Sequence, residues 1–263
     1  MLGCGHSLPY DIIIIGCDTM EEKIYYPTFN KKKICGILNI VSSKKEIAII
    51  CHARTSSKDS RPTTSLAKYL AQEKINNFRF DFISCGESDG DFNDYTVSNM
   101  VLNLKDTLKM LEKKGFEKFI LIGCSMGGRI ISLINEKEFN ISKLILWYPA
   151  LDYGRGIFNL PSQKERYAKK KGFFQIENGC KLSYEYFVDE RKYRAYKELY
   201  KKNCSKLFIH GTSDPFVPFS SSKEICRRSL NSKLILIENA DHGFHEENHM
   251  KTALEETIKF IKE

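Results

Sequence analysis

Short apolar runs alternate with amphipathic stretches along most of the 263-residue chain. Residues 47–51 and 119–122 are apolar at every position, which is typical of strands that are buried on both faces of a sheet. Over residues 97–114 the apolar positions recur every three or four residues, which indicates a helix with one buried face. This alternation predicts an α/β fold, with a mostly parallel central sheet flanked by helices.

The same patterns place the individual elements. Strands are expected at residues 22–29, 34–41, 47–51, 78–83, 119–122, 144–147, 207–209 and 234–237. Helices are expected at residues 63–75, 97–114, 219–229 and 247–262, and directly after Gly123. Glycine and aspartate dominate residues 86–94, which predicts a loop there.

Residues 152–203 interrupt the alternation, because they are charged and aromatic with a poor strand pattern. We interpret them as an insertion between two core strands that forms a small cap on a single domain spanning residues 21–263. Residues 1–20 carry no pattern that assigns them a role.

The composition is that of a globular protein, with 42% hydrophobic and 28% charged residues. The longest early apolar stretch, Ile12–Cys17, is far shorter than the roughly 20 residues that a membrane helix needs. It also lacks the flanks of a secretory signal, so we expect a cytoplasmic protein without a membrane span. The nine cysteines form neither a Cys-x-x-Cys pair nor a zinc-like spacing, which favours free thiols and predicts neither a metal nor a cofactor.

The formal net charge is +8, and residues 152–203 contribute much of it, with 13 Lys or Arg and 7 Asp or Glu. A solvated Lys-rich surface is the simpler interpretation of this segment. No nucleic-acid-binding signature accompanies the charge, so no nucleic-acid partner is expected. An anionic ligand for the segment stays a hypothesis, and a homodimer is left open as the assembly.

The pattern Gly-x-Ser-x-Gly occurs twice, around Ser125 and around Ser88. Such a turn between a strand and a helix exposes the serine hydroxyl as a nucleophile. Ser125 directly follows an apolar strand and directly precedes a helical pattern, whereas Ser88 lies in a polar loop. We therefore predict that Ser125 is the nucleophile. Cys124, which precedes it, is interpreted as a buried neighbour and not as a thiol nucleophile.

A serine nucleophile needs a histidine as base and a carboxylate to orient that histidine, and in this fold they follow in the order Ser, Asp or Glu, His. Asp214 follows the predicted strand at 207–209, with Asp152 as a second choice. His242 follows the predicted strand at 234–237, while the rivals His245 and His249 lie further from that strand. The sequence thus predicts a triad of Ser125, Asp214 and His242.

An oxyanion hole requires two backbone amides. One is expected from Met126, the residue after the nucleophile. The other is expected from the loop after the strand at 47–51, where Arg54 is favoured over Ala53 by position.

These motifs together resemble those of small bacterial carboxylesterases of the α/β-hydrolase superfamily, especially the cinnamoyl (feruloyl) esterase-like branch. The resemblance runs from about Glu22 to the C-terminus. It rests on the His52 loop, on residues 79–82 leading into the loop at 86–90, on the turn around Ser125, on His210-Gly211 with Asp214, and on Asp241-His242-Gly243. It implies cofactor-free hydrolysis of carboxylic esters, a structural role for the 86–90 loop, and an insertion that shapes the substrate pocket.

The chain departs from the family pattern at three positions near the predicted site. The loop reads His52-Ala53-Arg54 where His-Gly-aromatic is usual, and Cys85 and Cys124 each replace a histidine. These changes bear on the substrate more than on the reaction. The sequence therefore predicts a serine hydrolase that cleaves a small-molecule ester, with a thioesterase, an acyltransferase or a peptidase as near alternatives. A non-catalytic binding protein with the same fold is a more distant one.

Overall fold

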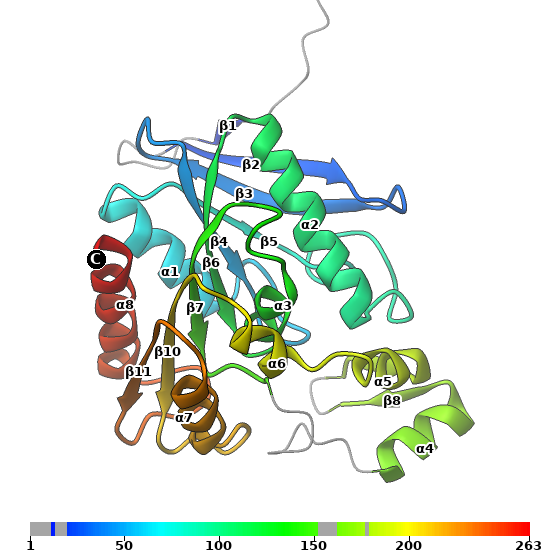
Figure 1. Cartoon of the computed structure of the whole chain (residues 1–263). Coiled ribbons are helices and arrows are strands. Elements are labelled where there is room, and N and C mark those ends of the chain that lie inside the picture. The colour runs from blue at the N-terminus through cyan, green and yellow to red at the C-terminus, as the bar shows by residue number, and fades with distance from the viewer. Residues whose placement is uncertain (1–11, 14–19, 152–161, 177–178) are drawn as a thin grey trace, which may run out of the picture.

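A computed structural model of the chain describes residues 12–13, 20–151, 162–176 and 179–263. Its main element is a nine-stranded sheet with the order β1-β2-β3-β5-β4-β6-β7-β10-β11 (Figure 1). The strands are β1 Ile12–Ile13, β2 Met20–Pro27, β3 Lys33–Ile40, β4 Glu46–Cys51, β5 Asn77–Phe80, β6 Lys118–Cys124, β7 Ile141–Trp147, β10 Ser205–Gly211 and β11 Ser232–Ile237. The predicted α/β architecture is confirmed.

One edge of the sheet is antiparallel and the rest is parallel. β2 pairs with β1 and β3 in antiparallel fashion, and β3 pairs in the same way with β5. From β5 through β4, β6, β7 and β10 to β11 every pairing is parallel. Because parallel strands end at the same edge of a sheet, the loops after β4, β6, β10 and β11 meet there.

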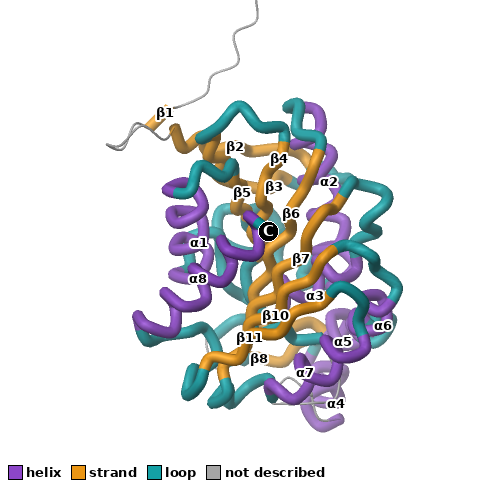
Figure 2. The backbone as a smooth tube through the Cα atoms, turned by 60° about the vertical axis from the view of Figure 1, so that its left-hand side comes forward, coloured by secondary structure: helices purple, strands orange, loops and turns teal. Residues whose placement is uncertain are grey.

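Helices cover both faces of the sheet (Figure 2). They are α1 Arg61–Gln72, α2 Val97–Lys113, α3 Met126–Leu133, α7 Phe219–Arg228 and α8 Glu247–Lys262. α1 and α8 contribute to the hydrophobic cluster on one face, and α2, α3 and α7 to the cluster on the other. The central strands β4 and β6 send side chains into both clusters, which explains why their sequences are continuously apolar.

Strand β5 ends earlier than its apolar pattern predicts, at Phe80 instead of residue 83. The chain leaves the sheet at Asp81, whose buried carboxylate accepts hydrogen bonds from the amides of Lys58 at 2.6 Å and Glu87 at 2.9 Å. Phe82 and Ile83 are still fully buried, although they lie in the loop after β5. Burial alone therefore produces a strand-like sequence here.

The described part of residues 152–203 forms a small unit beside the sheet, seen at the lower right of Figure 1. Its elements are α4 Ser162–Lys171, β8 Phe173–Gln175, β9 Lys181–Ser183, α5 Tyr184–Glu190 and α6 Ala195–Tyr200. β8 and β9 pair as a separate antiparallel sheet of two strands. Residues 152–161 and 177–178 of the predicted insertion lie outside the described residues.

Of the N-terminal residues 1–20, the described ones extend the antiparallel edge of the sheet through β1 and the start of β2. In the described part of the chain, every helix is too short or too polar to cross a membrane.

Candidate active site

Ser125 stands on the turn between β6 and α3, with φ of 52° and ψ of −109°. Such a conformation is strained for a residue with a side chain, and it is typical of a nucleophile turn. The flanking glycines are needed for space. A Cβ on Gly127 would lie 2.1 Å from the carbonyl oxygen of Cys51, and one on Gly123 would lie 2.5 Å from the backbone of Gly127. The predicted strand-turn-helix arrangement is present.

The structure brings the three predicted triad side chains together. His242 Nε2 lies 3.1 Å from Ser125 Oγ, and His242 Nδ1 lies 2.7 Å from Asp214 Oδ2. The side chains come from the loops after three different strands, β6, β10 and β11. The arrangement can pass a proton from the serine hydroxyl to an imidazole that a carboxylate holds in one orientation.

Four hydrogen bonds converge on the buried carboxylate of Asp214. Oδ1 accepts from the amides of Phe216 at 2.8 Å and Val217 at 2.9 Å, and Oδ2 lies within hydrogen-bonding distance of His242 and of His210 at 3.0 Å. Burial by itself would raise the pKa of Asp214, but the hydrogen bonds from His210 and His242 outweigh it and hold the pKa well below its usual range. Asp214 is therefore ionised wherever His242 can act as a base.

Two aromatic side chains pack against His242. The ring centroid of Tyr148 lies 4.6 Å from that of the imidazole, and the ring of Phe216 lies 5.4 Å away, nearly perpendicular to it. Tyr148 is buried and has a φ of 36°, so the end of β7 is strained beside the site. No role was predicted from the sequence for Tyr148, Phe216 or His210. Of the three, only His210 carries a signal, because it lies at a strand end shortly before Asp214.

The alternative candidates make other contacts. The hydroxyl of Ser88 donates to the carbonyl of Asp81 at 2.8 Å and accepts from the amide of Cys35 at 2.9 Å. Ser88 therefore has a structural role, because it connects the 86–90 loop to strand β3. His245 lies 2.7 Å from Asp241, and His249 lies 3.7 Å from Glu246.

Burial raises the pKa of the Cys124 thiol to about 12, which fits a buried neighbour and not a thiolate nucleophile. Asp152, the second choice for the acid, lies outside the described residues.

The two predicted oxyanion residues stand at the same end of the sheet. Met126 is the first residue of α3, and the first amides of a helix have no carbonyl partner within it. The loop with Arg54 is braced by His52, whose Nδ1 donates to the carbonyl of Ala53 at 2.7 Å and whose Nε2 accepts from the amide of Phe82 at 3.0 Å. Burial lowers the pKa of His52, which keeps the ring neutral, as these two bonds require.

Comparison with known proteins identifies the fold. Residues 49–171 match the model of a family described as alpha/beta hydrolase fold. The chain has the α/β-hydrolase fold. Among solved structures, Est1E from Butyrivibrio proteoclasticus with bound ferulic acid superimposes with a TM-score of 0.76 at 20% identity, over 91% of this chain and 100% of that one.

A second solved α/β-hydrolase, alpha/beta hydrolase domain-containing protein 10 from mouse, has a TM-score of 0.73 at 20% identity, over 91% of this chain and 98% of that one. The human palmitoyl-protein thioesterase ABHD10, a mitochondrial protein, is 26% identical over 179 residues, which cover 64% of this chain. The match spans 57% of the length of that relative. Other solved structures with this fold are named esterases, and the curated relative is named a thioesterase.

A buried ion pair connects the α/β-hydrolase core to the unit formed by residues 162–176 and 179–203. Arg129 on α3 lies 3.2 Å from Glu190 at the end of α5, and it also donates to the carbonyls of Glu190 and Tyr193. Burial raises the pKa of Glu190, although the nearby charges of Arg129 and Arg54 oppose the rise. The side chain of Arg54 also hydrogen-bonds Tyr186 on α5. Helix α5 of the insertion therefore contacts both helix α3, which begins at Met126, and the loop that carries Arg54.

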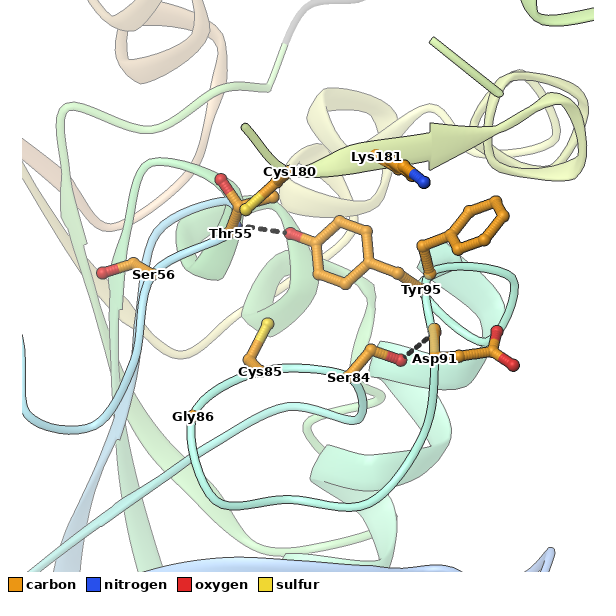
Figure 3. A pocket seen from close by; sticks show the side chains of 10 residues that line it. Thr55, Ser56, Ser84, Cys85, Gly86, Asp91, Tyr95, Cys180 and Lys181 are labelled. Atoms are coloured by element: carbon orange, nitrogen blue, oxygen red, sulfur yellow. Dashed lines mark hydrogen bonds between the residues drawn. The ribbon is translucent and has the colours of Figure 1, made fainter. Parts of the chain in front are cut away.

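A cavity of about 230 Å³ lies between the core loops and the β8–β9 hairpin (Figure 3). It is lined by Thr55, Ser56, Ser84, Cys85, Gly86, Asp91, Phe92, Tyr95, Cys180 and Lys181. The hydroxyl of Tyr95 accepts from the amide of Thr55 at 3.0 Å, which fixes one wall. The cavity is thus directly next to the loop that carries Arg54.

Several lysines of the insertion lie over aromatic rings, which is consistent with a packed, solvated surface. The pairs are Lys164 with Phe174 at 5.2 Å, Lys169 with Tyr184 at 5.8 Å, and Lys181 with Phe173 at 4.4 Å. Among the described residues, no group of three or more His, Cys, Asp or Glu side chains could hold a metal ion.

Proposed function

We propose that the chain is a serine hydrolase that cleaves carboxylic esters through an acyl-enzyme intermediate. The observation that carries the proposal is the continuous hydrogen-bonded chain Ser125–His242–Asp214 on a strained turn. A hydroxyl near neutral pH needs such a base to become nucleophilic. The similar proteins that are named esterases and thioesterases support the same reaction class.

The reaction follows from the contacts. Ser125 Oγ attacks the ester carbonyl while His242 Nε2 takes its proton, and Asp214 stabilises the resulting imidazolium. The amides of Met126 and Arg54 hold the oxyanion of the tetrahedral intermediate. The intermediate collapses, the alcohol leaves with the proton from His242, and an acyl-enzyme remains. Water, activated by His242, then releases the acid and restores Ser125.

The cavity beside Arg54 can bind one group of the substrate, because it lies between the predicted oxyanion loop and the insertion. Its volume is slightly below the usual range of about 300–1,000 Å³ for small-molecule sites, which favours a small group. We assign the insertion the role of a cap over the site.

Replacing Ser125 tests the proposal directly. We expect Ser125→Ala to lower the hydrolysis of short p-nitrophenyl esters by about 10⁵-fold or more, because the acyl-enzyme cannot form. A fluorophosphonate probe should label the wild-type protein at Ser125 and leave the variant unlabelled.

The matched control is Ser88→Ala, which changes the serine of the second Gly-x-Ser-x-Gly pattern and should keep most of the activity. Equal activity in the wild type and in Ser125→Ala, or activity lost only in Ser88→Ala, would show that the proposed nucleophile is wrong.

Thioesters are the second candidate substrate class, favoured by the curated relatives that are named palmitoyl-protein thioesterases. The same triad serves both chemistries, because the attacked carbonyl is alike and only the leaving group differs. Oxygen esters and thioesters with the same acyl chain, compared by kcat/KM, separate the two classes. The predicted cytoplasmic location stays a prediction, and the curated relatives are mitochondrial proteins.

A further inference from the structure

His210 contacts the same carboxylate as the triad histidine. Its ring is fully buried, with Nε2 lying 3.0 Å from Asp214 Oδ2 and 2.9 Å from the carbonyl oxygen of Val217. Both of these neighbours are acceptors, so Nε2 must carry a proton. The other nitrogen, Nδ1, lies 2.8 Å from the hydroxyl of Ser222 on α7. The ring is thus held at both nitrogens, in a single orientation.

Oδ2 of Asp214 is the point at which the two histidines meet. It accepts from His242 Nδ1 at 2.7 Å and from His210 Nε2 at 3.0 Å, while Oδ1 is occupied by two backbone amides. The carboxylate therefore cannot rotate without breaking several hydrogen bonds. Because Oδ2 accepts hydrogen bonds from two donors, its negative charge stabilises each donor less than it would stabilise a single donor.

We propose that His210 is a positioning residue of the active site, which fixes the Asp214 carboxylate and shares its Oδ2 with His242. The inference rests on the proposed function. During turnover His242 carries the proton of Ser125, and Asp214 stabilises that charged form. The donor from His210 limits this stabilisation, so His242 returns its proton to the leaving group more readily. Without that donor, Asp214 would favour the imidazolium more strongly.

Other titratable groups near His242 come from three elements. Asp241 and His245 lie in the loop after β11. Burial raises the pKa of Asp241, but the hydrogen bonds from His245 outweigh this effect, so the pKa lies below its usual value. Tyr148 at the end of β7 hydrogen-bonds Cys124, and burial raises the pKa of both groups well above the neutral range.

The guanidinium of Arg61 donates to the carbonyls of residues 244 and 245. None of these contacts involves His210, so a change at His210 acts on His242 through Asp214.

The test compares the pH dependence of kcat/KM in the wild type, His210→Leu and His210→Gln. Leucine removes the donor, whereas the amide of glutamine can place a donor near the position of Nε2. We expect the acidic limb of His210→Leu to move to higher pH by about 0.5–1 unit, the size expected for one lost hydrogen bond. We also expect a several-fold lower kcat with little change in KM. His210→Gln should keep the wild-type limb.

A merely structural role would lower activity without moving the limb, or would move it equally in both variants, and either result overturns the inference. Because His245 is an exposed histidine close to the site, the profiles are repeated in a His245→Gln background, where the shift must persist. If the activity does not depend on Ser125, the proposed function fails. If it depends on Ser125 but the limb stays in place, only the role of His210 fails.

A measurement on the wild-type protein does not require the leucine variant to fold. In protein with ¹⁵N-labelled histidine, we expect the NMR spectrum of His210 to show a hydrogen on Nε2 throughout the pH range of activity. The comparison with His210→Gln assigns the signal. A proton on Nδ1 alone would contradict the shared bond to Asp214, whatever the activity of the enzyme.

Discussion

At the scale of single residues, Gly127 is required by space and not by an unusual backbone angle. A Cβ at this position would meet the carbonyl oxygens of Cys51 at 2.1 Å and His52 at 2.7 Å, at the start of the loop that carries Arg54. We expect Gly127→Ala to destabilise the fold by about 1–3 kcal/mol, as overpacking does. It should also lower esterase activity, because the collision moves the predicted oxyanion loop. Thermal unfolding and kcat measure the two effects.

Gly115→Ala is the matched control. Gly115 has a φ of +96° and open space around its Cα, so an added methyl group causes backbone strain without a collision. That strain should lower stability by about 1–2 kcal/mol and leave kcat unchanged. An equal loss of kcat in both variants would mean that the effect at Gly127 is general destabilisation and not displacement of the loop.

The residues that the sequence could identify are those defined by their place in the chain. Ser125, Asp214 and His242 each follow a strand, so the parallel topology predicts that they meet at one edge of the sheet. Tyr148 and Phe216 were not predicted as neighbours of His242, because their contacts depend on how separate loops fold over one another. The spacing of residues along the chain also gives no sign that two histidines bond to the same carboxylate oxygen.

At the scale of elements, the buried ion pair between Arg129 and Glu190 joins α3 to α5. Glu190→Leu leaves the guanidinium of Arg129 buried without its carboxylate, so we expect it to lower the free energy of unfolding by about 3–5 kcal/mol. The double variant with Arg129→Leu should recover much of that loss, because no charge then remains unpaired in the interface. Chemical denaturation of the single and double variants gives the coupling energy.

The more exposed pair of Lys105 and Glu138, at 2.9 Å, provides the comparison. Its coupling should be about 0–1 kcal/mol, since water screens a surface pair. A coupling at Arg129 and Glu190 as small as this would show that the ion pair does not anchor the insertion to the core.

At the scale of the whole molecule, the sequence predicted the helices and strands of the core, but neither those of the insertion nor the order of the strands in space. β5 follows β4 in the chain, yet it lies between β3 and β4 in the sheet, and β10 joins β7 only after the whole insertion. Periodicity reports burial along one segment and carries no information about which distant strand will be its neighbour. Burial also made residues 81–83 look like strand, although the hydrogen bonds of Asp81 turn the chain there.

Acid stability is a property of the whole molecule that follows from its carboxylates. Hydrogen bonds from Lys58, Lys23 and Tyr25 lower the pKa of Glu87 to about 2, and these bonds tie the 86–90 loop to β2 and to the buried Lys58. Because the folded pKa lies below the unfolded value of about 4.3, the stabilisation is complete above that value and is lost as the pH falls toward 2. Asp214 acts in the same direction.

We therefore expect the melting temperature of the wild type to fall between about pH 5 and pH 2. Glu87→Gln should melt lower at pH 7 and lose less on acidification, because its side chain has no carboxylate to protonate. The difference in melting temperature between the variant and the wild type should be modest, since the side chain of Glu87 is 42% exposed. Glu112→Gln, at an exposed position of α2, should keep the wild-type pH dependence. If the melting curves of all three proteins shift in parallel with pH, the ion pairs of Glu87 do not contribute to acid stability.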